Sequence, residues 1–476
     1  MKFYGREGLL AQLGELWGRG MASLVTCRGR RRIGKSTLIK RFAEVSGARF
    51  FAFEGYAPEP GMKNEDQLLA FSRQFAEQAE RPFVEFGNWF DAFKALGGEM
   101  KSGVRTMLLL DEISWMGKCD PMFPSELKYA YDKRFHDCEE LVVVVCGSVS
   151  SWINENVLAN TGFVGRVSMD IVVPELTLAE AVNFWGERRT RTSIEEIADM
   201  LSVTGGVPRY LEEVRPELST DENIKRMCFR PNGYLFRDFN DIFTSVFSAR
   251  SPLKRAALVE LAKGSASGAE LAKALGVARN GQFTAMLEEL EMAGFVAGDS
   301  GLNPESGKRV REVRYRLRDN YSRFYLKYVE PHKAEIESGR YEFCSLENLP
   351  EWTTIMGLQF ENLIVNNFKA LLPFLHLDGV QVFSAAPFRK VKKDEERGVQ
   401  IDLLVQTRKA IVLVEVKRQA EIGESVEREV EQKIARLDLP KNKSVRTALV
   451  YSGKLTKAVR GNGYFDALIP LEGLIK

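Results

Sequence analysis

Short apolar runs alternate with segments of helical periodicity over residues 1–175. The strongest runs lie at residues 22–27, 106–110 and 141–147, and a shorter one follows at residues 171–174. Continuous apolar runs of this length are typical of strands buried on both faces of a parallel sheet. Their alternation with helices predicts an α/β fold built on such a sheet.

The first run is followed by GRRRIGKST at residues 29–37, which matches the pattern G-x-x-x-x-G-K-[ST] of phosphate-binding loops. Gly29 and Gly34 allow a tight turn in which backbone N–H groups point at an anion. Lys35 would reach the β- and γ-phosphates of a nucleoside triphosphate, and the Ser36 hydroxyl would bind Mg²⁺. The residues expected to bind the nucleotide are Gly29, Arg32, Ile33, Gly34, Lys35, Ser36 and Thr37.

The run at residues 106–110 ends in two carboxylates, Asp111 and Glu112. In open parallel sheets, ligands bind at the carboxyl ends of the strands, where these two side chains fall. We therefore expect Asp111 to hold Mg²⁺, and Glu112 to orient and polarise the attacking water. The sequence thus predicts hydrolysis of the bound triphosphate.

The middle of the chain predicts two further parts. Residues 176–245 have helical periodicity, interrupted by Gly205 and Gly206, and we expect them to form a lid over the nucleotide. Residues 246–332 predict a winged helix, with three helices followed by a glycine-containing hairpin. The second of these helices has a capping box, Ser267 with Glu270 three residues later.

The third helix of this module, at residues 280–293, occupies the position that reads the major groove of DNA. It carries Glu288, Glu289 and Glu291, and an acidic helix is disfavoured against DNA phosphates. The module therefore either contacts DNA through its basic wing or packs on protein.

A second chemical constellation lies near the C-terminus. Residues 401–405 and 410–416 are two apolar strands joined by a short turn. If Arg408 and Lys409 form a two-residue turn, Asp402 lies directly opposite Glu415. Lys417 points to the same face, because strand side chains alternate.

This trio of charges has a chemical use. Burying it without a partner ion is costly, and Mg²⁺ or Mn²⁺ would remove that cost. Two carboxylates that hold a metal, beside a lysine that orients or deprotonates water, suit phosphodiester cleavage. Glu361, in a helix at residues 357–370, is placed to be a further acidic ligand. The alternative is a surface hairpin with an ordinary Glu–Lys pair.

Composition narrows the class of protein. The chain has 476 residues, 45% hydrophobic and 28% charged, which indicates a globular protein of two to four domains. It has no apolar run long enough for a transmembrane helix and no signal peptide, so we expect a cytoplasmic location without membrane contact. Cysteines without C-x-x-C spacing favour reduced thiols, and three scattered histidines disfavour a histidine-rich metal site.

The net charge of +2 says little about partners, but the charge is uneven along the chain. Two short stretches are strongly basic. Each could face phosphates, or could be a solvated strand face. The residues are Lys308, Arg309, Arg311, Arg314, Arg316 and Arg318 in one stretch, and Arg389, Lys390, Lys392 and Lys393 in the other.

As a set, these motifs resemble those of archaeal-type ATPases of the additional-strand class, related to AAA+ and STAND proteins, fused to a PD-(D/E)xK nuclease-like domain. The resemblance extends over nearly the whole chain. It is carried by FYGREGLLAQL (3–13), GRRRIGKST (29–37), LLLDEISW (108–115), CGSVSSW (146–152), GFVGR (162–166), TGGVPRYL (204–211) and YRLRDNYSRFYLKYVEP (315–331).

The resemblance implies ATP as the nucleotide and Ser148 as a sensor of the γ-phosphate or the lytic water. It makes Arg166 an arginine finger that acts on a neighbouring subunit, and so implies a homo-oligomer. The C-terminal domain is expected to act on DNA. The implied domains are an ATPase core (1–175), a helical lid (176–245), a winged helix (246–332) and an α/β restriction-endonuclease-like domain (333–476).

Two functions remain open from the sequence. In the first, ATP binding and hydrolysis are coupled to a Mg²⁺-dependent DNA nuclease. In the second, ATP drives an oligomerising switch, and the C-terminal domain binds DNA or a partner without cutting.

Overall fold

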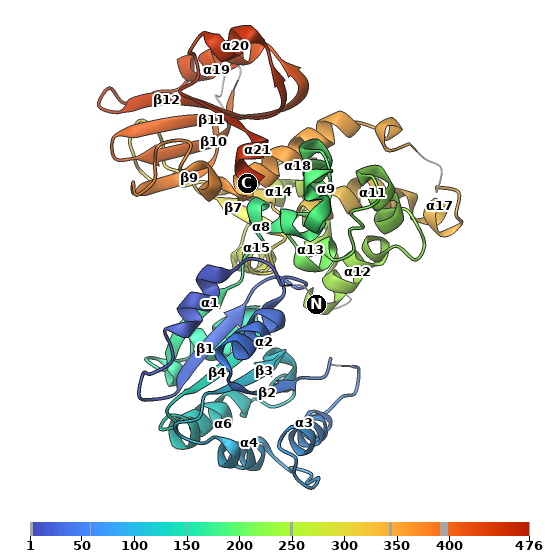
Figure 1. The fold of residues 1–476 in the computed structure, drawn as a ribbon, viewed down its shortest axis with the longest axis vertical. Helices are drawn as coiled ribbons and strands as arrows, with labels where there is room; N and C mark the ends of the chain where they lie inside the picture. Colours follow the sequence, from blue (N-terminus) through green and yellow to red (C-terminus); the bar gives the residue numbers. More distant parts are fainter. Residues whose placement is uncertain are drawn as a thin grey trace. The chain divides into compact units, whose positions relative to one another are not determined.

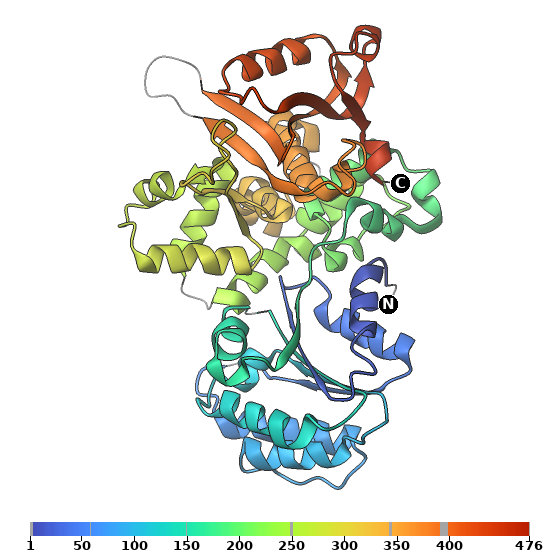
Figure 2. The ribbon, with the colours of Figure 1, turned by 90° about the vertical axis from the view of Figure 1, so that its left-hand side faces the viewer.

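The computed structural model describes residues 3–57, 59–148, 150–247, 251–341, 345–390 and 398–475. Lys392 and Lys393 of the second basic stretch lie outside these ranges. The chain divides into two compact units, Met1–Pro174 and Glu175–Lys476, drawn in Figures 1 and 2. In the described part of the chain, none of the helices combines the length and apolar composition that crossing a bilayer requires.

The first unit is built on a five-stranded sheet of order β2-β3-β4-β1-β5, in which all neighbouring strands are parallel. Its three central strands are rich in apolar residues and almost fully buried, so the predicted parallel α/β sheet is confirmed. The strands are β1 (Ser23–Arg28), β2 (Arg49–Glu54), β3 (Thr106–Asp111), β4 (Leu141–Gly147) and β5 (Val167–Val172).

The last strand begins earlier than the apolar run at residues 171–174 indicates. β5 lies at the edge of the sheet, where polar and apolar residues alternate. Its Asp170 accepts hydrogen bonds from Thr26 (2.6 Å) and from Arg28 on the neighbouring strand. A search for continuous apolar residues misses such a strand.

Helices cover both faces of this sheet (Figure 2). On one face, α1 (Glu7–Gly14) and α2 (Lys35–Ser46) pack on alternate residues of the central strands. On the other, α3 (Asn64–Gln78), α4 (Trp89–Glu99) and α6 (Phe123–Ala130) enclose a core rich in aromatic rings. The remaining short helical segments are α5 (Ile113–Met116), η1 (Tyr131–Phe135), α7 (Ser150–Ile153), η2 (Asn154–Leu158) and η3 (Thr161–Phe163).

The second unit opens with helices, in the segment for which the sequence predicts them. Gly205, with φ of 59°, ends α9 at the predicted break. A Cβ on Gly206 would lie 2.1 Å from the carbonyl oxygen of Leu176, so this close approach requires glycine. The helices are α8 (Leu178–Ala181), η4 (Val182–Thr190), α9 (Ile194–Thr204), α10 (Pro208–Leu211), α11 (Thr220–Cys228) and α12 (Tyr234–Phe247).

Next come α13 (Pro252–Lys263), α14 (Gly268–Ala274) and α15 (Gly281–Met292), and then a hairpin of β7 (Val296–Asp299) and β8 (Arg314–Leu317). A short strand, β6 (Ala266–Ser267), pairs with the other edge of β8. The capping box of Ser267 and Glu270 is present at the start of α14. Three helices and a hairpin are the element order on which the winged-helix prediction rests.

Glu289 and Glu291 of α15 bind protein groups. Lys254 of α13 makes an ion pair with Glu289, and the backbone N–H of Gly298 donates to Glu291. Burial first, and then the charge of Asp299, raise the pKa of Glu291. At least part of the acidic surface of this helix is therefore used for packing.

The C-terminal sheet has the order β13-β12-β11-β10-β9. Neighbours from β9 to β11 are antiparallel, and those from β11 to β13 are parallel. Helix α18 packs against β10 and β11 on one face, and α19 on the other (Figure 2). The strands are β9 (Val382–Lys390), β10 (Val399–Thr407), β11 (Ala410–Ile422), β12 (Ser444–Leu455) and β13 (Ala467–Pro470).

One apolar cluster runs through the second unit from Leu176 to Ile475 and joins its first helices to the C-terminal sheet. Buried amides reinforce it, because Asn320 and Gln359 both donate to the Ser202 carbonyl at 2.9 Å. The other helical elements are α16 (Asn320–Phe324), η5 (Tyr325–Val329), η6 (Glu330–His332), α17 (Lys333–Glu337), η7 (Leu346–Asn348), α18 (Trp352–Asn366), η8 (Phe368–Leu371), α19 (Ser425–Ala435), α20 (Lys457–Gly461) and α21 (Leu471–Ile475).

Candidate functional site

The phosphate loop leaves the end of β1, inside the sheet of the first unit, and leads into α2. Three of its residues have positive φ, namely Gly29 (141°), Arg32 (68°) and Gly34 (81°). A Cβ on Gly29 would lie 2.8 Å from the carbonyl oxygen of Val173, so only glycine fits there. The loop therefore ends at the N-terminus of a 12-residue helix, the arrangement that binds phosphate.

Lys35 is 7% exposed, and its ammonium is held against the loop. The ammonium donates to the carbonyl oxygens of Gly29 (3.1 Å) and Arg30 (3.2 Å). Both acceptors belong to the loop that would enclose the phosphates. Lys35 can thus exchange these carbonyls for phosphate oxygens without leaving the loop.

The two predicted magnesium ligands of this unit meet. The Ser36 hydroxyl donates to Asp111 Oδ2, and Asp111 Oδ1 accepts from the backbone N–H of Glu112 at 3.0 Å. A hydroxyl and a carboxylate oxygen are hard donors of the kind Mg²⁺ takes beside substrate phosphates. The residues present therefore fit a magnesium ion bound together with a nucleotide.

Glu112 and the predicted sensor Ser148 also meet. The Ser148 hydroxyl lies 3.0 Å from both carboxylate oxygens of Glu112, and its backbone N–H donates at 3.3 Å. Ser148 is 1% exposed, directly after β4, and Glu112 directly follows β3. The structure thus joins the predicted water-orienting carboxylate to the predicted sensor.

Two residues of this site were missed by the sequence analysis. Glu54 ends β2 in register with Asp111, and burial first, and then the charges of Asp111 and Glu112, raise its pKa. Its strand, RFFAFE, ends in an acidic residue as β3 does, but only the order of the strands brings the two carboxylates together. Arg6 donates to the Ile33 carbonyl of the loop at 2.5 Å, and its place in the N-terminal motif could have indicated this role.

Arg166 forms a two-point ion pair with Asp132, at 2.6 and 2.9 Å, and Lys128 joins the same carboxylate at 2.9 Å. The hydrogen bond from Arg166 is the main cause that lowers the pKa of Asp132 to about 2. The Arg166 side chain remains 31% exposed. The predicted arginine finger is therefore held by its own chain, on η1, and is accessible at the surface.

In the second unit the predicted hairpin register is confirmed. Leu403 pairs with Val414, which puts Asp402 opposite Glu415 across β10 and β11. Lys417 lies on the same face, with its ammonium 3.1 Å from Glu415. Asp402 and Glu415 are 7% and 4% exposed, so two carboxylates and a lysine converge at a largely buried position.

Helix α19 adds a second lysine to this trio. The ammonium of Lys433 lies 2.8 and 2.6 Å from the two oxygens of Glu415. Glu429, one helical turn earlier, binds Lys417 at 2.7 Å. The sequence analysis missed both residues, because their contacts with β11 depend on where α19 packs.

Burial sets the electrostatics of the trio. It raises the pKa of Asp402 to about 8, reinforced by the charges of Glu415 and Glu361. Burial also raises the pKa of Glu361, against the opposing charge of Arg323. Burial would lower the pKa of Lys417, but its bond to Glu429 and the charge of Glu415 outweigh burial and raise it to about 12.

Asp402, Glu415 and Lys417 line a pocket of about 600 Å³ together with Glu361 of α18. Within the described ranges, no group of three or more His, Cys, Asp or Glu side chains lies close enough to hold a metal ion. Two hard donors, Asp402 and Glu415, fit a divalent cation, which would compete with Lys433 for Glu415. The pocket is completed by residues that include Thr353, Gln400, Arg418, Glu429, Gln432, Lys433 and Arg436.

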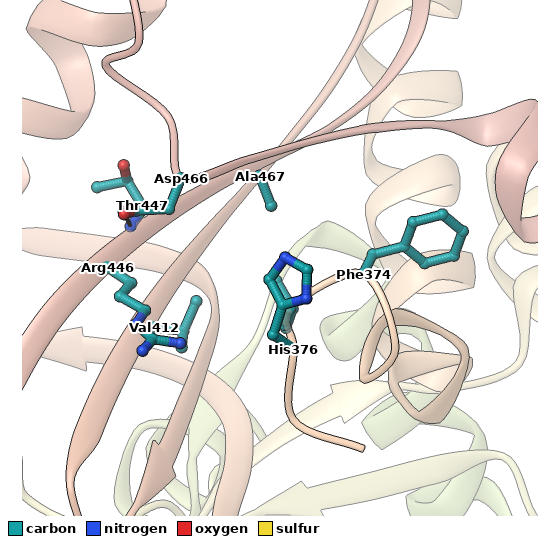
Figure 3. A pocket seen from close by; sticks show the side chains of 8 residues that line it. Phe374, His376, Val412, Arg446, Thr447, Asp466 and Ala467 are labelled. Carbon is teal, nitrogen blue, oxygen red and sulfur yellow. Dashed lines mark hydrogen bonds between the residues drawn. The ribbon is translucent and has the colours of Figure 1, made fainter.

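Another pocket, of about 410 Å³, contains none of the predicted site residues (Figure 3). His376 and Arg446 point into it from different elements. Its Asp466 accepts a hydrogen bond from the Thr447 backbone N–H at 2.8 Å. The carboxylate therefore has a structural partner.

Comparison with known proteins finds a family that resembles the first part of the chain. Residues 3–214 match a family described as an ATPase domain predominantly from Archaea. The chain is also 24% identical over 428 residues to the uncharacterized protein MJECL04 of Methanocaldococcus jannaschii, covering 87% of each chain.

Solved structures also match the chain at low identity. The Walker-type ATPase PABY2304 of Pyrococcus abyssi is 16% identical, with a TM-score of 0.48, over 68% of this chain and 96% of that one. The ORC2 protein of Aeropyrum pernix, in ADPNP–ADP complexes, is 15% identical, with a TM-score of 0.41, over 70% and 94%. Residues 3–214 thus match an archaeal-type ATPase domain, and they contain a loop with the geometry of a phosphate-binding loop.

Proposed function

We propose that the protein hydrolyses ATP at its phosphate loop and uses this cycle to control metal-dependent cleavage of DNA at Asp402, Glu415 and Lys417. One observation carries the cleavage half of the proposal. Two carboxylates and a lysine, brought together by the hairpin register, line one pocket of about 600 Å³. This is the combination that phosphodiester hydrolysis uses.

In the ATPase half, Lys35 and the loop N–H groups would hold the phosphates, and Ser36 and Asp111 would hold Mg²⁺. The ion would neutralise charge on the phosphates. Glu112 would orient the attacking water, and its bond to Ser148 links that carboxylate to the sensor position. Mutual placement of these side chains supports hydrolysis rather than binding alone.

Arg166 would complete this site on a neighbouring subunit. Its guanidinium is partly exposed and bound to Asp132, so it can be offered to a partner only when that ion pair opens. Because Arg166 would act on the nucleotide of a neighbouring subunit, the proposal includes a homo-oligomer. An arginine supplied in this way stabilises charge in the transition state.

In the nuclease-like half, Asp402 and Glu415 would hold Mg²⁺ or Mn²⁺, with Glu361 as a further ligand from α18. Such an ion supplies charge stabilisation at phosphorus and activates water. Lys433 would move from Glu415 when the cation binds. Lys417, held by Glu429, would orient the water or a phosphate oxygen.

A cleavage assay tests the proposal. Linear, circular and branched DNA are incubated with Mg²⁺ or Mn²⁺, with and without ATP, beside Lys417→Ala and Asp402→Asn. Lys409→Ala, in the exposed turn between the same strands, is the matched control. We expect cleavage by the wild type and by the control, and its loss in the other two variants. Absence of cleavage of every DNA by the wild type would reject the nuclease assignment.

A second function is favoured by one observation. Glu415 is already neutralised by Lys433 and Lys417, as in a structural ion-pair network. In that case ATP would drive oligomerisation, and the C-terminal sheet would bind DNA or protein without cutting. Light scattering with and without ATP tests this, with Lys35→Ala as the variant that cannot grip phosphates. An ATP-dependent mass increase without cleavage supports the switch, and an unchanged mass contradicts it.

A further inference from the structure

A basic pocket of about 300 Å³ adjoins the candidate catalytic pocket. The two share Leu358 and Glu361 of α18 and Gln400 of β10, so their walls are continuous. The basic pocket extends from these residues to the β7–β8 hairpin, α16 and β9. Its charged lining is Lys263, Arg314, Arg316, Arg323 and Arg389, with Asp299 and Glu361.

The lining has five basic and two acidic side chains, and one basic and one acidic side chain form an ion pair with each other. Arg316 binds Asp299 at 2.9 Å, and both side chains are only about one-eighth exposed. Arg314 binds Glu270 at 3.0 Å, outside the lining set, but its buried Nε has no hydrogen-bond partner among the described residues. Positive charge therefore remains on the pocket wall.

Arg323 is the most informative of these residues, because it is 6% exposed and faces uncharged acceptors. Its guanidinium donates to Gln359 Oε1 at 3.0 Å and to the Leu317 carbonyl at 3.4 Å, and its Nε has no partner in the described part of the chain. Burial lowers its pKa to about 10, so it is still a cation at neutral pH. The charges of Glu361 and Asp319 offset part of the cost of burying this cation, although neither carboxylate is bonded to it, and a bound anion would offset more of it.

We infer that this pocket binds a backbone phosphate of a single DNA strand, one that flanks the phosphodiester to be cut at the proposed metal site of Asp402 and Glu415. The inference rests on the proposed function and names its substrate as a single strand. Arginine guanidinium groups match phosphate oxygens in charge and geometry. Because the two pockets share a wall, one strand can occupy both.

The size and the apolar part of the lining also fit one strand. Leu358, Val365, Pro387 and Phe388 provide an apolar wall for sugar and base. About 300 Å³ is at the lower end of ligand pockets, so it admits a nucleotide but excludes a base pair with both backbones. The expected substrate is therefore a single-stranded or unpaired end.

DNA binding without cleavage tests the inference. Binding of a fluorescein-labelled single-stranded oligonucleotide is followed by anisotropy over a range of salt, with EDTA present. The variant is Arg389→Gln with Lys263→Gln, both exposed, and Arg314→Gln is made separately. Arg446→Gln, from the pocket of Figure 3, is the matched control, and circular dichroism checks folding.

We expect each pocket variant to bind the single strand about tenfold more weakly, with a smaller dependence on salt, and the control to bind like the wild type. Unchanged binding by the pocket variants would overturn the inference, as would stronger binding of duplex than of single strand. In the Lys35→Ala background, competition by ATP or inorganic phosphate at lower concentration than DNA would assign the pocket to a free anion instead, and overturn it. Weakened binding in a protein that cuts no DNA would support the pocket and reject only the proposed cleavage.

Discussion

Glu112 has a left-handed backbone conformation, with φ and ψ both 46°, where non-glycine residues are uncommon. Such a conformation costs on the order of 1–3 kcal/mol and persists when the surroundings impose it. Here the buried end of β3 and the start of α5 impose it, and Ser148 binds the carboxylate. The strained position is a reason to expect that Glu112 acts on the nucleotide.

Glu112→Gln keeps the size of the side chain but removes its charge. We expect ATP affinity to stay within about twofold, because Lys35 and the loop are untouched, while hydrolysis falls by roughly 10²- to 10⁴-fold. Phosphate release and binding of a fluorescent ATP analogue measure the two effects. Glu139→Gln, an exposed residue of the same unit, should change neither. Equal loss of binding and hydrolysis would show that Glu112 shapes the loop instead.

Lys433 sits where a cation would bind, because its ammonium contacts both oxygens of Glu415. Lys433→Met keeps most of the side-chain bulk and removes the competing charge. We therefore expect tighter Mn²⁺ binding by calorimetry, by about tenfold, one charge pair being of order 1 kcal/mol or more. Lys409→Met should bind Mn²⁺ like the wild type. Weaker binding in the Lys433 variant would mean that this lysine supports the site rather than competing for it.

At the scale of single residues, the sequence predicts which side chains lie close together when they belong to one strand or flank one turn. Asp402, Glu415 and Lys417 were predictable because a two-residue turn fixes the pairing and alternation fixes the face. Lys433 and Glu429 were not, because their contact depends on how α19 crosses the sheet. Glu54 was missed for a similar reason, since it approaches Asp111 only through strand order.

At the scale of elements, an ion pair between Asp199 and Arg418 joins α9 to β11. Burial raises the pKa of Asp199 from 3.8 to about 6, even though Arg418 opposes this rise. The folded protein therefore holds this proton more tightly than the unfolded chain does. The stability that comes from this group is complete below about pH 4 and is lost as the pH rises through about 6.

Asp199→Asn removes this titration. Between about pH 4 and 6, the free energy of unfolding of the wild type should fall relative to that of the variant, by up to about 3 kcal/mol. Urea unfolding at several pH values, followed by circular dichroism, measures the difference. Asp378→Asn, an exposed residue of the same unit, is the control. Parallel pH profiles for the wild type and Asp199→Asn would contradict the prediction.

Elements with strong periodicity were predictable, and those shaped by their neighbours were not. The buried strands β1, β3 and β4 and the capped helix α14 lie where the apolar runs and the capping box indicate. The edge strand β5 begins earlier than the apolar run indicates, since Ser168 and Asp170 interrupt the apolar residues of its first part. The ion pairs of the basic hairpin were not predicted either. Arg314 binds Glu270 and Arg316 binds Asp299, and these contacts depend on how the hairpin folds.

At the scale of the whole molecule, Arg166 tests whether subunits complete each other's sites. Arg166→Ala should leave ATP affinity nearly intact and lower turnover by about 10³ or more. Stability should change little, because the pair with Asp132 is partly exposed and screened by solvent. ATP turnover and light scattering measure the effect, with exposed Arg19→Ala as the control. Loss of ATP binding in step with turnover would make Arg166 a structural residue.

The apolar cluster shared from Leu176 to Ile475 has a mechanical consequence. Helix α9 packs on α18, and α18 packs on β11, the strand that carries Glu415 and Lys417. A displacement of α9 would therefore be passed to β11 through packed side chains of α18. A C-terminal fragment that lacks α9 would expose the apolar side of α18 that α9 covers. We therefore expect the C-terminal sheet and α18 to be less stable when they are separated from the first helices of this unit.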